Sequence, residues 1–180
     1  MGYMIKTTQS SFSISKANLP KFFDIVSDLM TDENVEKNGR GGSWNGNKKT
    51  ASWYSWVNTD MVRLAVSHRD IVSVFNEWRY DLEFDYETKD TLSFILMIRG
   101  GEAKIGQEEV FFAAIAPVVD HGCFLDAEGE DGEEWRWLWE NGKFYKQSVV
   151  DKTVNYSEPY EICVDDADAN NDEFRSTDMS

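Results

Sequence analysis

Hydrophobic and polar residues alternate strictly along residues 134–140, which read EWRWLWE. Successive side chains of an extended chain point to opposite faces, so Trp135, Trp137 and Trp139 share one face. The opposite face is mostly charged and is formed by Glu134, Arg136, Leu138 and Glu140. One apolar and one polar face are typical of a strand in a half-buried antiparallel sheet. We therefore expect the three indole rings to pack in the core.

Turn signals lie on both sides of this tryptophan strand. The segment EDG precedes it, and Asn141-Gly142 follows it. A type I′ hairpin turn needs positive φ at both central residues, a conformation for which Asn-Gly is a preferred pair. Further strand-like segments flank the two turns, at 123–129 and 144–150. We therefore predict a three-stranded antiparallel meander in this part of the chain.

Helical and extended patterns alternate in the rest of the chain. Apolar residues recur at helical spacing in three segments, namely 15–34, 67–81 and 106–119. Asn18 is the expected N-cap of the first helix, and Pro20 is acceptable in its first turn. Ser67 and Asp70 have capping-box spacing, which predicts the start of the second helix. Strand-like patterns occupy 3–14, 51–57 and 82–98, the last as a hairpin.

These elements predict an α+β fold in a single domain over residues 1–163. Its expected architecture is an antiparallel sheet with about three helices packed on one face, ending in the three-stranded meander. From residue 164 onward the chain is acidic and has almost no apolar residues. Such a segment cannot bury enough apolar surface to offset its ordering entropy, so we expect 164–180 to form a disordered acidic tail.

Charge decides which partners are plausible. The chain has 33 acidic and 18 basic residues, a formal net charge of -15. A protein this acidic repels phosphate backbones and attracts basic surfaces, so we expect a basic protein partner and no binding of free nucleic acid. A base-stacking role for the tryptophan strand is also disfavoured, because stacking platforms lie beside Lys and Arg. Acidic residues gather instead beside this strand, at Glu128, Glu130, Asp131, Glu133 and Glu134. These five are the candidate partner-binding residues.

The glycine-rich segment 39–49 offers an alternative function. It holds the densest basic group, which suggests a mobile loop that binds a small ligand or nucleotide. Its candidate ligand residues are Arg40, Gly41, Gly42, Trp44, Lys48 and Lys49. In that case Trp44 would stack on the ligand while the cations neutralise phosphate. The Gly-Lys-Ser/Thr ending of a P-loop is absent, since Gly46 is followed by Asn47 and Lys48.

Catalytic and metal-binding patterns are weak throughout. Cys123 and Cys163 lack the close Cys or His spacing of a zinc site, and His68 and His121 have no nucleophile in a recognisable context. We expect no enzyme activity, no metal and no cofactor. The N-terminal residues lack an apolar signal region, and the apolar runs are shorter than the ~20 residues of a membrane span, so we expect a cytoplasmic protein.

Three stretches together resemble a known group of proteins. They are MGY at the N-terminus, GGSW before SWYSW, and AIAPVVDHGCFLDAEGEDGEEWRWLWENGK. In these stretches the chain resembles small uncharacterised acidic proteins of bacteriophages and bacterial mobile elements, over about residues 1–145. That group has no assigned chemistry, so the resemblance implies only a setting, a phage-encoded protein made in the host cytoplasm. With the charge, it suggests a non-enzymatic acidic binding protein that engages a basic host or phage protein. Two versions stay open, an acidic accessory protein without mimicry and an inhibitor of a nucleic-acid-processing defence system that has a DNA-mimic-like surface.

Overall fold

The computed structural model describes residues 2–151 and 155–165. Within these residues the helices are α1 (Leu19–Leu29), α2 (Asp32–Asn38), α3 (Thr59–Ser67), α4 (Ile71–Glu77) and α5 (Glu108–Ile115). The strands of the main sheet are β1 (Met4–Ser15), β4 (Tyr80–Glu87), β5 (Thr91–Ile98), β6 (Glu102–Lys104), β7 (Cys123–Gly129), β8 (Glu134–Glu140), β9 (Lys143–Asp151), β10 (Asn155–Tyr156) and β11 (Tyr160–Glu161). Strands β2 (Gly41–Asn45) and β3 (Lys48–Trp53) form a separate hairpin.

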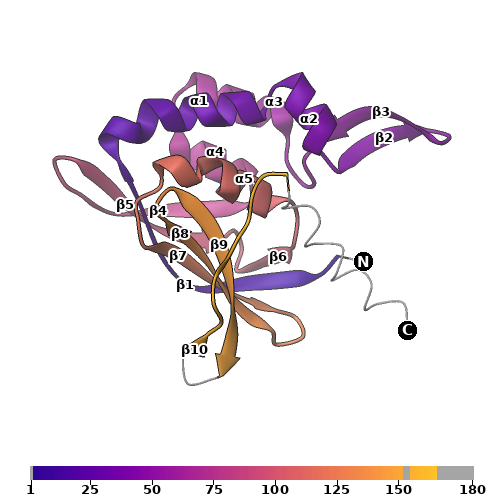
Figure 1. The fold of residues 1–180 in the computed structure, drawn as a ribbon. Helices are drawn as coiled ribbons and strands as arrows, with labels where there is room; N and C mark the ends of the chain where they lie inside the picture. The colour runs from indigo at the N-terminus through magenta and orange to yellow at the C-terminus, as the bar shows by residue number, and fades with distance from the viewer. Residues whose placement is uncertain (1, 152–154, 166–180) are drawn as a thin grey trace.

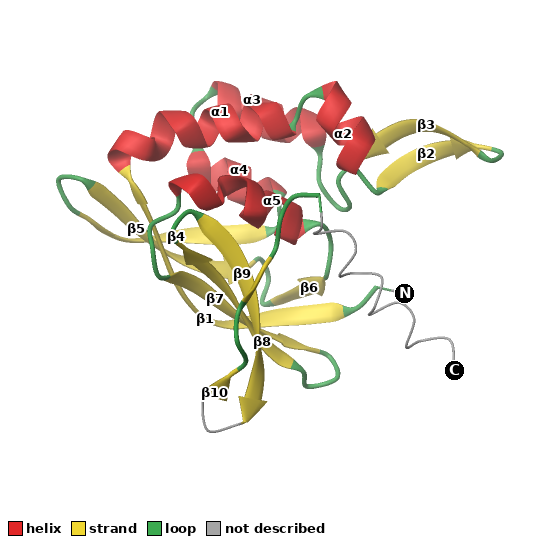
Figure 2. Ribbon diagram, viewed as in Figure 1, coloured by secondary structure: helices red, strands yellow, loops and turns green. Residues whose placement is uncertain are grey.

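The main sheet has the strand order β10-β9-β8-β7-β1-β5-β4, with antiparallel pairing at each step. The long β1 is at the centre, because β7 pairs with one edge of it while β6 and β5 pair with the opposite edge, at its start and its end. Figure 1 shows the sheet curving beneath the helices and the β2–β3 hairpin projecting from the helical layer. The helices cover one face of the sheet, with α4 and α5 nearest to it (Figure 2). The predicted α+β class and its helix layer are confirmed.

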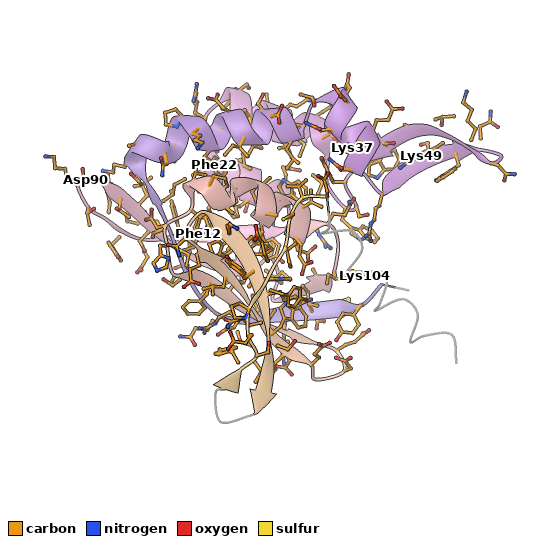
Figure 3. The ribbon with its side chains drawn as sticks, viewed as in Figure 1. Phe12, Phe22, Lys37, Lys49, Asp90 and Lys104 are labelled. Atoms are coloured by element: carbon orange, nitrogen blue, oxygen red, sulfur yellow. The ribbon has the colours of Figure 1, made fainter. Side chains whose placement is uncertain are left out.

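An aromatic core joins the two layers. Phe12 of β1 packs edge-to-face on Phe75 of α4 and on Trp139 of β8, with ring centroids 5.2 and 5.7 Å apart. Phe75 in turn stacks against Phe22 of α1, and Figure 3 shows Phe12 on the sheet side of this core and Phe22 on the helix side. Phe112 of α5 packs against the tryptophans of β8. Edge-to-face aromatic packing adds to the burial of these large rings and fixes the helices over the sheet.

The predicted meander is confirmed, since β7, β8 and β9 pair in sequence. Trp135, Trp137 and Trp139 are each no more than 1% exposed, so the tryptophan strand faces the core as predicted. Asn141 and Gly142 have φ of 52° and 77°, the positive values that a type I′ turn requires. The hairpin predicted over 82–98 is also confirmed, as β4 and β5.

The glycine-rich segment is not the loop that its composition predicts. Gly39 is the C-cap of α2, and residues 41–49 form most of the β2–β3 hairpin. The glycines allow close packing between the strands, because a Cβ at Gly41 would collide with the indole of Trp53 and one at Gly42 with the side chain of Lys49. Small residues are required here by a neighbouring side chain, which the sequence pattern alone does not reveal.

Two helix boundaries also differ from the prediction. Ser67 ends the unpredicted helix α3, and Asp70 is itself the N-cap of α4, accepting a hydrogen bond from the amide of Ser73. Asn18 makes no side-chain cap, because a 3-10 turn over residues 16–18 leads into α1. The count of about three helices was therefore too low, as α2 and α3 were missed.

The predicted acidic tail falls largely outside the described residues. Its first two residues are described, and both contact the domain. Val164 packs against the core, and Asp165 forms an ion pair with Lys37 at 3.1 Å. Residues 166–180 lie outside the described ranges, so the predicted disorder of 164–180 stays a prediction.

Candidate functional site

The five acidic residues predicted as a partner surface lie together where β7 turns into β8. We call Glu128, Glu130, Asp131, Glu133 and Glu134 the acidic turn. Glu128 and Glu134 are direct cross-strand partners, an arrangement in which like charges repel. Lys6 of the neighbouring β1 offsets part of that repulsion through an ion pair with Glu128 at 3.1 Å. The others are exposed apart from Glu133, which is partly buried.

The acidic turn is held in one conformation by contacts with β1. The Tyr3 hydroxyl donates a hydrogen bond to Asp131, and the amide of Glu130 donates to the carbonyl of Met4 at 2.9 Å. Inside the turn, the amide of Glu133 donates to Asp131 Oδ1 at 3.1 Å. The amide of Gly129 donates to the carbonyl of Glu133 at 2.8 Å. The carboxylates therefore project from an ordered backbone.

The same contacts keep Asp131 charged. The hydrogen bond from Tyr3, followed by that from the Glu133 amide, lowers the pKa of Asp131 below its ordinary value. Burial and the hydrogen bond with Asp131 raise the pKa of Tyr3, so its hydroxyl keeps its proton and stays a donor. At neutral pH Asp131 is therefore an anion fixed by a neutral phenol.

The residues of the alternative ligand site are spread along the hairpin. Trp44 is 62% exposed on β2, and Lys48 lies near the hairpin tip. Lys49 pairs across the strands with Trp44, but its Nζ donates to the carbonyl of Gly39 at 2.7 Å. At the other end of β2, the amide of Arg40 donates to Gln107 Oε1 at 2.9 Å. The hairpin thus brings Trp44 beside Lys49, but Arg40 lies at its base, away from Lys48.

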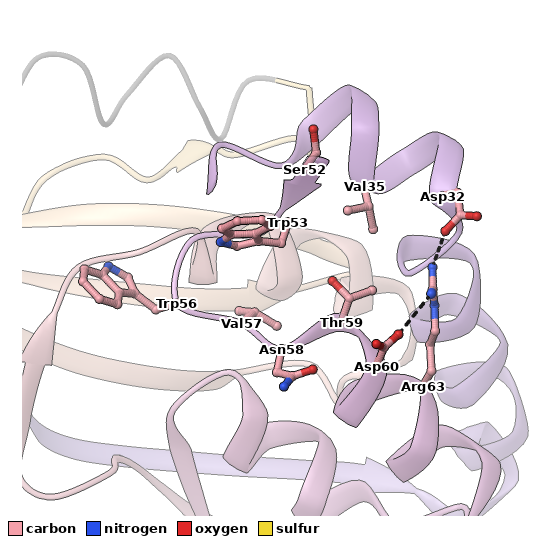
Figure 4. Close-up of a pocket in the computed structure, with 10 residues that line it drawn as sticks. All are labelled: Asp32, Val35, Ser52, Trp53, Trp56, Val57, Asn58, Thr59, Asp60 and Arg63. Atoms are coloured by element: carbon pink, nitrogen blue, oxygen red, sulfur yellow. Dashed lines mark hydrogen bonds and ion pairs between the residues drawn. The ribbon is translucent and has the colours of Figure 1, made fainter. Parts of the chain in front are cut away.

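A second aromatic site was missed by sequence reasoning. Trp56, in the segment between β3 and α3, is 59% exposed and has a positive φ of 65°. Two cations from distant parts of the chain, Arg79 and Lys104, each lie 5.8 Å from the centre of its ring. Trp56 also lines a pocket of about 650 Å³ together with Trp53 (Figure 4). The segment SWYSWV gives no sign that one of its tryptophans is strained and exposed.

A cluster of charged groups is buried between α5 and the sheet. Glu109 Oε1 accepts a hydrogen bond from Trp137 Nε1 at 2.7 Å and lies 3.5 Å from Lys146 Nζ. Glu108, one residue earlier, accepts from the Tyr80 hydroxyl at 3.4 Å. Burial raises the pKa of Glu108, and the positive charge of Arg79 opposes that shift. Carboxylates are favourable in the first turn of a helix, but here they are almost fully enclosed.

Other features of the described residues bear on chemistry. Cys123 is buried and Cys163 is exposed, and no disulfide joins them. Within residues 2–151 and 155–165, no three His, Cys, Asp or Glu side chains are grouped as a metal site requires. In the same ranges, no helix is both long and apolar enough to cross a membrane. No protein-family model, no curated protein and no solved structure matches the chain.

Proposed function

We propose that the protein is a non-enzymatic acidic binding protein that engages a basic protein through the acidic turn. The observation that supports this is the order of the turn. Charge kept only for solubility needs no fixed geometry, and mobile carboxylates serve it equally well. Here a tyrosine hydroxyl and the backbone of β1 fix the turn. A surface arranged before binding loses less entropy when a partner docks.

The partner most compatible with this surface presents Lys or Arg side chains. In the sharpest form of the proposal, the carboxylates stand where DNA phosphates would lie, and the protein inhibits a nucleic-acid-processing defence system. The setting, a phage-encoded protein in the host cytoplasm, is supported by the sequence resemblance alone. The net charge of -15 supports the exclusion of free nucleic acid. A gel shift with plain duplex DNA at physiological salt would contradict that exclusion.

The test compares two charge reversals of equal size. Glu130→Lys with Glu134→Lys alters the acidic turn and spares Asp131, which holds the turn in place. Glu83→Lys with Asp85→Lys alters two exposed residues of the edge strand β4 and serves as the matched control. Each variant and the wild type would capture proteins from host lysate, followed by association rates with the captured partner at two salt concentrations.

Only the reversal in the acidic turn should slow association strongly, and added salt should narrow the difference by screening the charges. An equal effect of both reversals would show that net charge matters and the turn does not. A partner that is not basic, or a rate indifferent to salt, would also contradict the proposal.

The alternative, ligand binding by residues 39–49, is less well supported, because most of these residues belong to the β2–β3 hairpin and not to a loop. Its glycines serve strand packing, and Lys49 is bonded to the backbone. The role of Arg40, Trp44 and Lys48 in ligand binding stays a prediction. Trp44→Ala and Lys48→Gln decide between this alternative and a ligand site around Trp56, because the alternative predicts that they weaken ligand binding and a site around Trp56 predicts that they do not.

A further inference from the structure

Trp56 occupies a backbone position for which a bulky residue is poorly suited. The amide of Val57 donates to the carbonyl of Tyr54 at 3.0 Å, which closes a turn with Trp56 as its third residue. Its φ of 65° lies in the left-handed region, where turns usually place Gly or Asn. A tryptophan there is conformationally strained, yet its ring remains 59% exposed. Burial of the indole therefore does not explain why it occupies this position.

The strained turn is held by hydrogen bonds to the side chain of Gln107, a residue that is only 1% exposed. Its Oε1 accepts hydrogen bonds from the amides of Ser55 and Arg40, each at 2.9 Å. Its Nε2 donates to the carbonyl of Asn38 at 2.7 Å. One buried amide thus ties the turn to the end of α2 and to the base of the hairpin. Strained residues held by surrounding structure are commonest at functional sites.

Positive charge converges on the Trp56 ring. Arg79 follows α4, and Lys104 ends β6, and the guanidinium of Arg79 donates to the carbonyl of Lys104. Within the described part of the chain neither side chain has a carboxylate within ion-pair distance. Arg79 also has a positive φ, of 68°. In a chain with nearly twice as many acids as bases, two cations on one exposed indole favour an anionic ligand.

The pocket beside Trp56 has an aromatic part and a polar part, and each suits a different part of a ligand. Its volume of about 650 Å³ is within the range of small-molecule sites. Trp53 and Trp56 supply aromatic walls, and Val57 is a buried apolar residue beside them (Figure 4). At the far end Arg63 is already bonded to Asp32 at 2.6 Å and to the carbonyl of Met30 at 2.7 Å. Asp32 and Asp60 also line that end and repel an anion. The anionic group is therefore placed beyond the Trp56 ring, beside Arg79 and Lys104, which are not among the lining residues.

We propose that this site binds a nucleotide, with the base against the indoles of Trp53 and Trp56 and the phosphate on Arg79 and Lys104. A flat ring joined to a phosphate matches an aromatic pocket wall whose outer ring, Trp56, has two cations beside it. A mononucleotide fits better than a nucleic acid strand, because the net charge of -15 repels a long phosphate backbone. The inference does not rest on the acidic turn, although the two sites meet at one end of β1, where Met4 pairs with Lys104 and its carbonyl accepts from the amide of Glu130.

The ligands for the test are adenosine and uridine 5′-monophosphates, with adenosine and uridine as phosphate-free controls and a ten-nucleotide thymidine strand as the polymer. Binding is measured by calorimetry and by quenching of tryptophan fluorescence. Trp56→Gly removes the stacking ring and relieves the positive φ, so the fold should keep its melting temperature. It should weaken binding about tenfold or more, the scale of a lost base stack. Trp44→Ala, at an exposed indole outside the site, should leave binding unchanged.

The phosphate subsite is tested by Lys104→Gln against Lys48→Gln. Only Lys104→Gln should weaken binding of the monophosphates, and it should leave the weaker binding of the nucleosides unchanged. Arg79→Gly and Arg69→Gly form a second matched pair, because both arginines have positive φ just after a helix. Arg69 stacks on Phe23 and should not affect the ligand.

Four outcomes would overturn the proposal. They are the absence of nucleotide binding up to millimolar concentration, equal affinity for nucleoside and nucleotide, tighter binding of the strand than of the monophosphates, or equal losses in the Trp44 and Trp56 variants. Unfolding of Trp56→Gly would contradict the claim that the indole is not required for stability.

Discussion

Removing Lys146, the positive partner of the buried Lys146–Glu109 ion pair, should destabilise the fold far more than removing both charges together. Lys146 is 4% exposed and Glu109 1%, and their Nζ–Oε1 distance is 3.5 Å. At an effective dielectric constant of about 20, two charges this far apart attract by about 5 kcal/mol. Lys146→Met leaves Glu109 with the hydrogen bond from Trp137 and no opposite charge within ion-pair distance among the described residues. We expect a loss of about 3–5 kcal/mol of unfolding free energy.

The double variant Lys146→Met with Glu109→Gln should recover most of that loss. The side-chain oxygen of glutamine can still accept the hydrogen bond from Trp137 Nε1, and no charge remains buried. Replacing both members of a buried pair by neutral groups is often close to neutral in stability. Lys146 also lies over the ring of Trp135 at 5.0 Å, and the unbranched methionine can retain part of that packing.

Urea unfolding of the wild type, both single variants and the double variant gives the coupling energy of the pair. The structure predicts a double variant that is clearly more stable than Lys146→Met alone. If the two single losses simply add, then the two charges do not interact and the buried pair is not formed in solution.

Three further predictions concern stability. Burial raises the pKa of Glu108, so between the unfolded pKa of about 4.3 and the raised value the folded protein holds a proton that the unfolded chain has lost, and the wild type loses stability as pH rises through this range. Glu108→Gln has no such proton and should therefore gain stability relative to the wild type as pH rises, whereas a stability difference independent of pH would contradict the raised pKa. Asn141→Ala should cost about 1 kcal/mol in thermal unfolding, because alanine is strained at a φ of 52°, whereas Asn141→Gly should be nearly neutral. Trp137→Ala should cost about 3–5 kcal/mol in urea, and near-wild-type melting would show that the ring is not a core residue.

Periodicity predicted those parts of the fold that local pattern determines. The tryptophan strand alternates strictly and is bounded by turn residues, so its buried face and the meander could be predicted. Helix α3 could not, because only Val62 and Ala65 are buried while Met61 and Leu64 are exposed, which blurs the apolar face. The β2–β3 hairpin was not predicted, because its glycines suggest a loop. The contacts with Trp53 and Lys49 that require glycine there are made between strands and cannot be seen in the sequence.

The two candidate sites also differ in how far the sequence predicts them. The acidic turn is contiguous in sequence, so its residues could be named, although its anchor Tyr3 lies 128 residues away from Asp131. The Trp56 site is assembled from three separate segments and depends on a positive φ. Neither the convergence of Arg79 and Lys104 nor the strain at Trp56 leaves a pattern in the sequence. Tertiary structure alone brings these groups together.

The most direct test of the proposed function is the affinity of Tyr3→Phe for the captured basic partner. This substitution removes the hydroxyl that donates to Asp131 and changes no charge at neutral pH. If the ordered turn is the recognition surface, the association rate should stay within about twofold and dissociation should become about two- to tenfold faster, the scale of ordering one or two side chains on binding. Unchanged dissociation, with the turn shown by NMR to have lost its order, would contradict the claim that its fixed geometry serves recognition.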